Sequence, residues 1–262
     1  MAIYNYLCNI KLETKVMKTL KGKVILITGS SRGIGAEIAK VVAQAGAKVV
    51  INYTSGKDAA EKVVLEINST GGESIALQAN VSISKDVTRL FDQAIAHFGR
   101  IDVLINNAGI MFNKLIKDTL DDDFDRILDV NVKGVFYTLR EAATKLADKG
   151  SIINFSTSVN RIILPSYGPY VASKAAVEQL TRVFAKEIGF RGINVNSVSP
   201  GPTNTELFMN GKSDEVISHL AAFSAFNRIG EPIDIARVVA FLASDEAKWI
   251  SAQNIGINGG MA

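Results

Sequence analysis

The chain of 262 residues is poor in the residues that crosslink proteins or bind metals. It has one cysteine, Cys8, and two histidines, His97 and His219. A single cysteine excludes an intrachain disulfide and fits a reducing compartment, so we expect a cytoplasmic protein. The histidines lie far apart and have no cysteine near them, so no metal site is expected. A chain of this length can instead be stabilised by an apolar core.

The sequence also lacks long apolar runs and clusters of one charge. No run reaches the roughly 18 apolar residues of a membrane-spanning helix. The formal net charge is only +3 and the basic residues are scattered, which argues against nucleic-acid binding. Residues 1–16 lack the features of a signal peptide. We expect residues 1–19 to form a disordered or loosely packed extension, or to reflect an upstream start assignment, and residues 20–262 to form one domain.

From Lys23 onward, short β-branched apolar runs alternate with helical patterns. The expected strands are Val24–Thr28, Lys48–Asn52, Ser74–Ala79, Val103–Asn106, Ser151–Phe155, Asn194–Ser197 and Asn254–Ile257. The expected helices include Gly35–Ala45, Ala59–Ser69, Val87–Phe98, Phe124–Lys145 and Tyr170–Gly189. This alternation predicts a doubly wound α/β fold, with a seven-stranded parallel sheet and helices on both faces. Residues 201–225 lack a clean strand pattern and are a candidate mobile lid.

A glycine-rich turn joins the first expected strand to the first expected helix. Its sequence from position 28 to 35 is TGSSRGIG. Glycines allow close approach of a pyrophosphate to the free N–H groups at a helix start. The spacing alone also fits an ordinary tight turn, but its place in the first βαβ unit favours dinucleotide binding. The candidate residues are Gly29, Ser31, Arg32, Gly33, Ile34 and Gly35.

The end of the second expected strand indicates the type of dinucleotide. NAD sites usually place an acidic residue there to bind the ribose hydroxyls. Here the strand ends in Asn52, Tyr53 and Thr54, with no acidic residue through position 57. The absent carboxylate, with Arg32 in the turn and Lys57 nearby, favours NADP(H), although Arg32 could also be a solvated charge.

Tyr170 and Lys174 form a candidate acid/base pair. They are four residues apart in an expected helix, so their side chains share one face. An ammonium near a phenol would lower its pKa from about 10 toward neutrality, which suits proton exchange with an alcohol or carbonyl. Taken alone, this spacing is a weak signal.

The motifs taken together resemble the short-chain dehydrogenase/reductase family over nearly the whole chain, from about Lys18 to Ala262. The motifs are TGSSRGIG at 28–35, NNAG at 106–109, NVKG at 131–134, hydroxyl residues at 156–158, YVASK at 170–174 and SPGPTNT at 199–205. The chain is also similar to the family's 3-oxoacyl-carrier-protein-reductase-like branch. The resemblance implies a Rossmann fold.

The resemblance implies catalytic roles for four residues. Tyr170 would exchange the proton, Lys174 would lower its pKa and hold the nicotinamide ribose, and Asn131 would support a water that relays protons to Lys174. The family's catalytic serine lies thirteen residues before the tyrosine, and here that position is Thr157. A threonine hydroxyl can donate the same hydrogen bond. Because Ser156 and Ser158 flank it, a shifted register would give the role to a serine.

Further cofactor contacts follow from the same resemblance. Asn106, Asn107, Ala108 and Gly109 would line the pocket beside the fourth strand. Asn80, followed by Val81, stands where the family usually has an aspartate that contacts adenine. The remaining candidates are Pro200 and Gly201, followed by Thr203 and Thr205, which resemble the residues that hold the carboxamide.

The function that this pattern predicts is NADP(H)-dependent reduction of a ketone, aldehyde or 3-oxoacyl group to an alcohol. A non-catalytic NADP sensor, and an isomerase or dehydratase, remain as alternatives. The apolar helices near 124–145 and 170–189 favour a homotetramer, as is common in the family. Phe208, Met209, Phe223 and Phe226 suggest an apolar substrate, but they fit equally well as residues that pack the lid.

Overall fold

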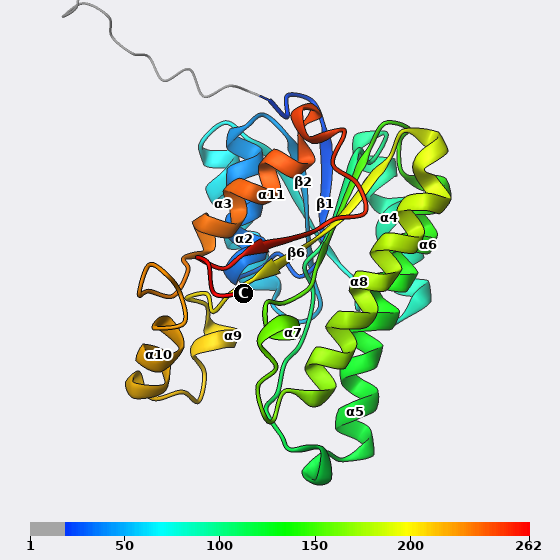
Figure 1. Ribbon diagram of the computed structural model, residues 1–262. Coiled ribbons are helices and arrows are strands. Elements are labelled where there is room, and N and C mark those ends of the chain that lie inside the picture. Colours follow the sequence, from blue (N-terminus) through cyan, green and yellow to red (C-terminus); the bar gives the residue numbers. More distant parts are fainter. Residues whose placement is uncertain (1–18) are drawn as a thin grey trace, which may run out of the picture.

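Seven parallel strands form the central sheet of the computed structural model, which describes residues 19–262 (Figure 1). The predicted extension, residues 1–19, lies outside the described residues apart from Thr19. The strand order is β3-β2-β1-β4-β5-β6-β7, so the chain reverses its direction of winding between β1 and β4. The predicted seven-stranded parallel sheet is confirmed. The strands are β1 (Val24–Ile27), β2 (Lys48–Tyr53), β3 (Glu73–Gln78), β4 (Val103–Asn106), β5 (Ser151–Phe155), β6 (Asn194–Pro200) and β7 (Asn254–Ile257).

Long helices cover both faces of the sheet, as Figure 1 shows. One face carries α2 (Gly33–Gln44), α3 (Lys57–Ser69) and α11 (Pro232–Ala243). The other carries α4 (Ser84–Phe98), α6 (Gly134–Lys145) and α8 (Gly168–Ile188). The predicted helices did not include α11, because its second half is an almost continuous apolar run with little helical periodicity.

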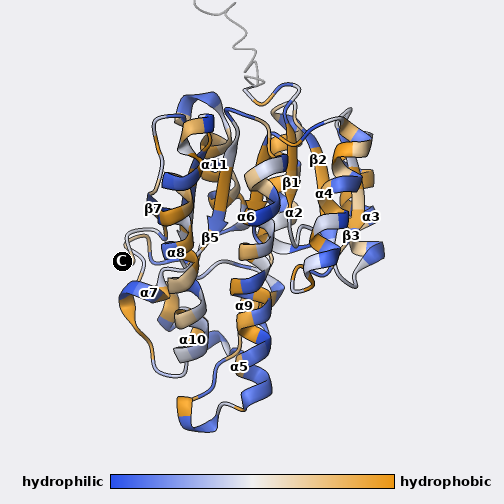
Figure 2. Cartoon of the chain, turned by 90° about the vertical axis from the view of Figure 1, so that its right-hand side faces the viewer, coloured by the Kyte–Doolittle hydropathy of each residue, from blue (hydrophilic) through white to orange (hydrophobic). Residues whose placement is uncertain are grey.

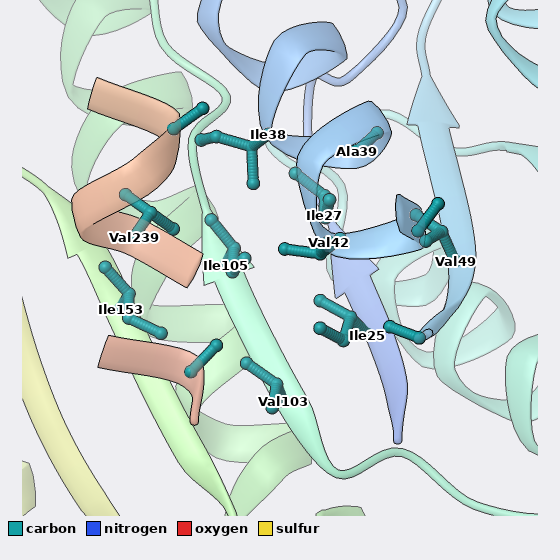
Figure 3. Packing of buried hydrophobic residues seen from close by; sticks show 14 of the residues in the cluster. Ile25, Ile27, Ile38, Ala39, Val42, Val49, Val103, Ile105, Ile153 and Val239 are labelled. Atoms are coloured by element: carbon teal, nitrogen blue, oxygen red, sulfur yellow. The ribbon is translucent and has the colours of Figure 1, made fainter. Parts of the chain in front are cut away.

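Alternate residues of each strand supply the two cores. Ile25 and Ile27 of β1 pack with Ile38 and Val239 from α2 and α11 (Figure 3). The intervening Leu26 belongs to the core under α4, α6 and α8. Burial on both faces explains why the strands read as continuous apolar runs, which are orange in Figure 2.

The prediction of one uninterrupted helix over Phe124–Lys145 is wrong in one respect. The chain forms α5 (Asp121–Leu128), then a π-helical turn over Asp129–Lys133, and only then α6. A π turn accommodates one more residue than an α turn and so redirects the side chains before it. This turn places Asn131 in a fully buried position at the end of the sheet that carries the site.

Two short helices follow β6 where no strand was expected. They are α9 (Glu206–Met209) and α10 (Asp214–Ala221), which project beyond the end of the sheet in Figure 1. Opposite them lie α5 and the short α7 (Val159–Ile162). Within residues 19–262, no helix is both long and apolar enough to cross a membrane.

Candidate active site

A cavity of about 960 Å³ opens at the carboxyl ends of the strands. Its walls come from the loops after β1 to β6 and from the first turn of α9. It lies where the winding reverses between β1 and β4, which is the usual ligand position in an open parallel sheet. The fold therefore brings together motifs that are far apart in sequence.

The turn after β1 packs tightly against the loop after β4. Asn107 Nδ2 donates hydrogen bonds to the carbonyl oxygens of Thr28 at 3.0 Å and Gly29 at 2.8 Å. A Cβ on Gly29, whose φ is +62°, would lie 2.8 Å from Ala108 Cα. A Cβ on Gly35 would lie 2.5 Å from Asn107 Nδ2. Glycine is thus required at both positions, and the bare backbone leads into the start of α2, where a phosphate can be held.

Asn52 supports this turn from behind. Its side chain is buried, with Oδ1 accepting from Gly29 N at 3.2 Å and Nδ2 donating to Leu77 O at 3.3 Å and Ala79 O at 3.1 Å. The prediction that Asn52 contacts a cofactor is therefore corrected, because it does not line the cleft and its polar atoms are engaged. Gly35 likewise serves packing and does not line the cleft.

The far end of the cleft carries a positive charge and no carboxylate from β2. Ser31, Arg32, Tyr53 and Thr54, which were predicted to contact the cofactor, all line it. The Arg32 guanidinium forms an exposed ion pair with Glu206 of α9, with Nη1 and Oε2 3.1 Å apart. Arg32 therefore already faces an anionic group across the mouth of the cleft.

Asn80 lines the same end of the cleft with a fixed side chain. Its Oδ1 accepts from Ser82 N at 3.1 Å and from Ser82 Oγ at 2.8 Å. Because a backbone N–H needs an acceptor, these bonds define the amide orientation. Asn80 can then offer only its NH₂ group to a ligand, whereas an aspartate would offer an acceptor. Val81 lies beside it in the lining.

The two candidate acid/base residues lie on the first turns of α8. Pro169 stands at the helix start, and Tyr170 and Lys174 both reach the cleft. Lys174 Nζ donates to the carbonyl oxygen of Phe155, the last residue of β5, at 2.8 Å, and lies 6.0 Å from the centre of the Tyr170 ring. A Cβ on Gly109 would approach Nζ to 3.3 Å, so a glycine keeps this approach open.

The pKa values of this pair differ from the expectation. Burial raises the pKa of Tyr170 to about 12, although a hydrogen bond from Thr157 acts to lower it. Burial also lowers the pKa of Lys174 to about 8. The expected fall for the tyrosine is therefore wrong here, because desolvation dominates and the ammonium is directed to Phe155 O. At neutral pH Tyr170 keeps its proton, which is the form that a proton donor requires.

Of the three neighbouring hydroxyl residues, Thr157 faces Tyr170. The hydroxyl of Ser158 donates to Ser199 O at 2.9 Å, and that of Ser156 donates to Glu178 Oε1 at 2.6 Å. Both serine protons are therefore used away from the tyrosine. The structure places Thr157 at the position that the spacing predicts and directs the flanking serines elsewhere.

Asn131 lies behind the site and does not line the cleft. Its Oδ1 accepts from Ile110 N at 2.8 Å, and its Nδ2 donates to Ile110 O at 2.9 Å and Ser173 Oγ at 3.0 Å. The side chain thus ties the loop after β4 to α8. Asn106 is also turned away, since its amide donates to Asn154 Oδ1 at 2.8 Å, and so the cleft residue of this motif is Asn107.

The remaining predicted residues that line the cleft come from the turn after β1 and the start of α2, and from the chain at the ends of β4 and β6. They are Gly29, Gly33, Ile34, Ala108, Gly109, Pro200, Gly201, Thr203 and Thr205. The hydroxyl of Thr205 caps α9 by accepting from Phe208 N at 3.2 Å.

The sequence analysis missed most of the apolar lining beside Tyr170. This lining comprises Ile110, Met111, Val159, Ile162, Leu164, Tyr167, Leu207, Leu220 and Met261. Of the four apolar residues singled out near the lid, Phe208 lines the cleft and Met209, Phe223 and Phe226 do not. No local pattern marks these residues, because their meeting depends on loops from different parts of the chain.

Known proteins resemble this chain along most of its length. A family model described as enoyl-(acyl carrier protein) reductase matches residues 29–262. Versicolorin reductase of Emericella nidulans is 45% identical over 253 residues, covering 92% of this chain and 96% of that protein. The structure of a short-chain dehydrogenase/reductase from Serratia marcescens is 37% identical with a TM-score of 0.89, covering 93% of this chain and 99% of that one. The angucycline C-6 ketoreductase LanV, solved with bound NADP, is 38% identical with a TM-score of 0.88, covering 93% and 96%.

The tight turn after β1 leads to a first prediction. Gly29→Ala should abolish dinucleotide binding, because its Cβ would meet backbone and not a flexible side chain. Binding is measured from the fluorescence of NADPH. Gly71→Ala is the matched control, since Gly71 also has a positive φ but has no atom within 4 Å of the added Cβ. It should lose about 1–2 kcal/mol of stability and keep full binding. Unchanged binding in Gly29→Ala would refute the proposed packing constraint.

Proposed function

The chain belongs to the short-chain dehydrogenase/reductase family, and we propose that it reduces a carbonyl group to an alcohol with NADPH, using Tyr170 as the proton donor. One observation carries this proposal. A protonated tyrosine, a threonine hydroxyl and a buried lysine meet in a cleft whose opposite half is a glycine-rich turn at a helix start. That combination serves an acid/base reaction on a substrate held beside a dinucleotide.

The residues present fit a dinucleotide. Gly29 and Gly33, both with a positive φ, form a turn without side chains that leads into the start of α2, where backbone N–H groups could hold a pyrophosphate. Tyr170 and Lys174 mark the nicotinamide end, so the adenosine end would extend over β2 and β3 to Asn80. When bound, the nicotinamide supplies the hydride that reduces the carbonyl carbon.

The protein's own groups handle the oxygen of the substrate. The hydroxyls of Tyr170 and Thr157 hold the carbonyl oxygen, and the developing negative charge takes the proton of the tyrosine. The Lys174 ammonium then stabilises the tyrosinate and returns a proton to it. Asn131 fixes the loop beside Lys174, and we assign it a supporting role in the supply of that proton.

The choice of NADPH over NADH follows from charge at the far end of the cleft. No carboxylate from the end of β2 opposes a 2′-phosphate, and Arg32 is free to exchange its exposed partner Glu206 for the phosphate. The related ketoreductase LanV binds NADP in its solved structure, which supports the same choice here.

The substrate we propose is an apolar ketone or aldehyde, with 3-oxoacyl groups included. Met111, Leu164, Leu207 and Met261 line the cleft, and the ring centre of Tyr167 lies 6.4 Å from that of Tyr170. The related versicolorin reductase is named as a reductase and LanV as an angucycline ketoreductase, which supports a carbonyl substrate here. A panel of ketones, aldehydes, quinones and 3-oxoacyl esters with NADPH tests the class.

We also propose that the protein acts in the cytoplasm as a homotetramer. Phe136 of α6 and Val183 of α8 are exposed apolar residues. Figure 2 shows these two helices on the side that was at the right in Figure 1. Such side chains would be covered if two copies packed these helices together. Light scattering measures the number of subunits.

A second prediction concerns the proton donor. Tyr170→Phe should lower kcat for carbonyl reduction by about 10²–10⁴-fold, because the phenolic proton is lost, while the Kd for NADPH stays unchanged. Full turnover in this variant would exclude Tyr170 as the donor. Tight NADPH binding by the wild-type protein without reduction of any carbonyl in the panel would favour a non-catalytic sensor.

A third prediction concerns pH. Since the pKa of Lys174 is lowered to about 8, its ammonium loses its proton as the pH rises through 8, and kcat/KM for reduction should fall there. Tyr170 stays protonated over this range. Lys174→Met, which cannot titrate, should show low but pH-independent activity between pH 7 and 9. If kcat/KM of Lys174→Met falls over the same pH range, the fall is caused by the titration of another group.

A fourth prediction concerns the phosphate. Arg32→Ala should raise the Kd for NADPH by about 10-fold or more and leave the Kd for NADH nearly unchanged, because only NADPH carries the 2′-phosphate. Lys57, which the sequence analysis also weighed in favour of NADP(H), pairs with Glu61 at 3.5 Å and does not line the cleft, so Lys57→Ala should change the Kd for NADPH much less than Arg32→Ala does. Equal losses for the two dinucleotides in Arg32→Ala would contradict the assignment.

A further inference from the structure

Glu178 lies behind the catalytic residues, on α8 and four residues after Lys174. Its Oε1 accepts the hydroxyl proton of Ser156 at 2.6 Å and an amide proton of Asn160 at 2.7 Å. We propose that Glu178 is a positioning residue for the carbonyl reduction: it holds the chain on both sides of Thr157, so that the Thr157 hydroxyl faces Tyr170. This inference rests on the proposed function.

The segment that carries Thr157 is held from two directions. On the side of β6, Ser156 N donates to Val198 O at 2.8 Å and Ser158 N donates to Pro200 O at 3.0 Å. On the side of α8, the anchoring group is the carboxylate of Glu178. One helix thus supplies both Tyr170 and the group that fixes the partner of Tyr170.

The carboxylate also determines which hydroxyl can serve the reaction. The Ser156 proton is committed to Glu178, since a hydrogen bond to a carboxylate is stronger than one between neutral groups. Thr157 Oγ1 instead accepts from Val159 N at 3.3 Å. Its own proton is therefore left for donation to Tyr170 or to a substrate oxygen.

Asn160 extends the same network into the wall of the cleft. Its Nδ2 contacts both Glu178 and Ser156 Oγ, the latter at 3.3 Å, while its buried Oδ1 has no hydrogen-bond partner among residues 19–262. Asn160 belongs to α7, whose other residues Val159 and Ile162 line the apolar part of the cleft. With Oδ1 unpaired, the side chain of Asn160 is held from its Nδ2 end, by Glu178 and Ser156.

A double-mutant cycle tests the proposal. Glu178→Ala should lower kcat by about 10–100-fold through misplacement of Thr157, with the Kd for NADPH unchanged. Glu178→Gln should remain within about 3-fold, because its amide oxygen still accepts both protons. Thr157→Ala alone should lower kcat by about 100-fold. When Glu178→Ala is added to it, the further loss of kcat should be less than about 2-fold. Glu187→Ala, at an exposed site on the same helix, should not change kcat.

The outcomes separate positioning from a general structural role. The proposal is wrong if the losses of kcat from Glu178→Ala and Thr157→Ala multiply in the double variant. It is also wrong if Glu178→Ala weakens NADPH binding as much as it lowers kcat. A crystal structure of Glu178→Ala with the Thr157 hydroxyl still on Tyr170 would also contradict it. If Glu178→Ala does not fold, Ser156→Ala replaces it in the cycle with the same expected dependence on Thr157. If the wild-type protein reduces no carbonyl compound, the proposed function is wrong. If it does, and the losses of kcat from Glu178→Ala and Thr157→Ala are independent, only the role proposed for Glu178 is wrong.

Discussion

The contact between the turn after β1 and the loop after β4 is the constraint on which the site depends. Asn107 joins the two by hydrogen bonds to the carbonyl oxygens of Thr28 and Gly29. Asn52 closes the same turn from the side of β2 and β3. Because these bonds join the two halves of the sheet at the point where the winding reverses, the glycine-rich turn and the candidate acid/base residues share one cleft.

Burial shapes the chemistry of the opposite half of that cleft. Removing Tyr170 and Lys174 from water favours their neutral forms, and so the phenol holds its proton more tightly while the ammonium holds its proton less tightly. The two shifts widen the separation of the two pKa values, with tyrosine at about 12 and lysine at about 8. At neutral pH both groups therefore carry the protons that an oxygen gaining negative charge would need.

Much of the fold and the centre of the site could be predicted from local sequence. The strands are recognisable because burial on both faces demands continuous apolar runs, and Tyr170 and Lys174 are recognisable because helical spacing alone puts them together. The errors have tertiary causes. Asn52 supports the turn because its amide donates hydrogen bonds to Leu77 O and Ala79 O, at the end of the neighbouring strand. The position of Asn52 in the sequence does not reveal this contact.

The same reasoning explains why Glu178 and the pKa of Tyr170 escaped prediction. A glutamate in the middle of an amphipathic helix is ordinary, and only the packing of α8 against β5 gives it Ser156 and Asn160 as partners. Lys174 was expected to act on Tyr170 through charge, but the direction of its Nζ toward Phe155 O is a property of the assembled strand and helix.

The π-helical turn at Asp129–Lys133 makes the length of this part of the chain as important as its composition. Loss of one residue would allow a regular α-helix from α5 into α6 and would rotate Asn131 by about 100° relative to α6. Its hydrogen bonds to Ile110 and Ser173 could not survive that rotation. Substitution of surface residues on these helices therefore leaves this connection intact, whereas an insertion or deletion between the helices would separate the loop after β4 from α8.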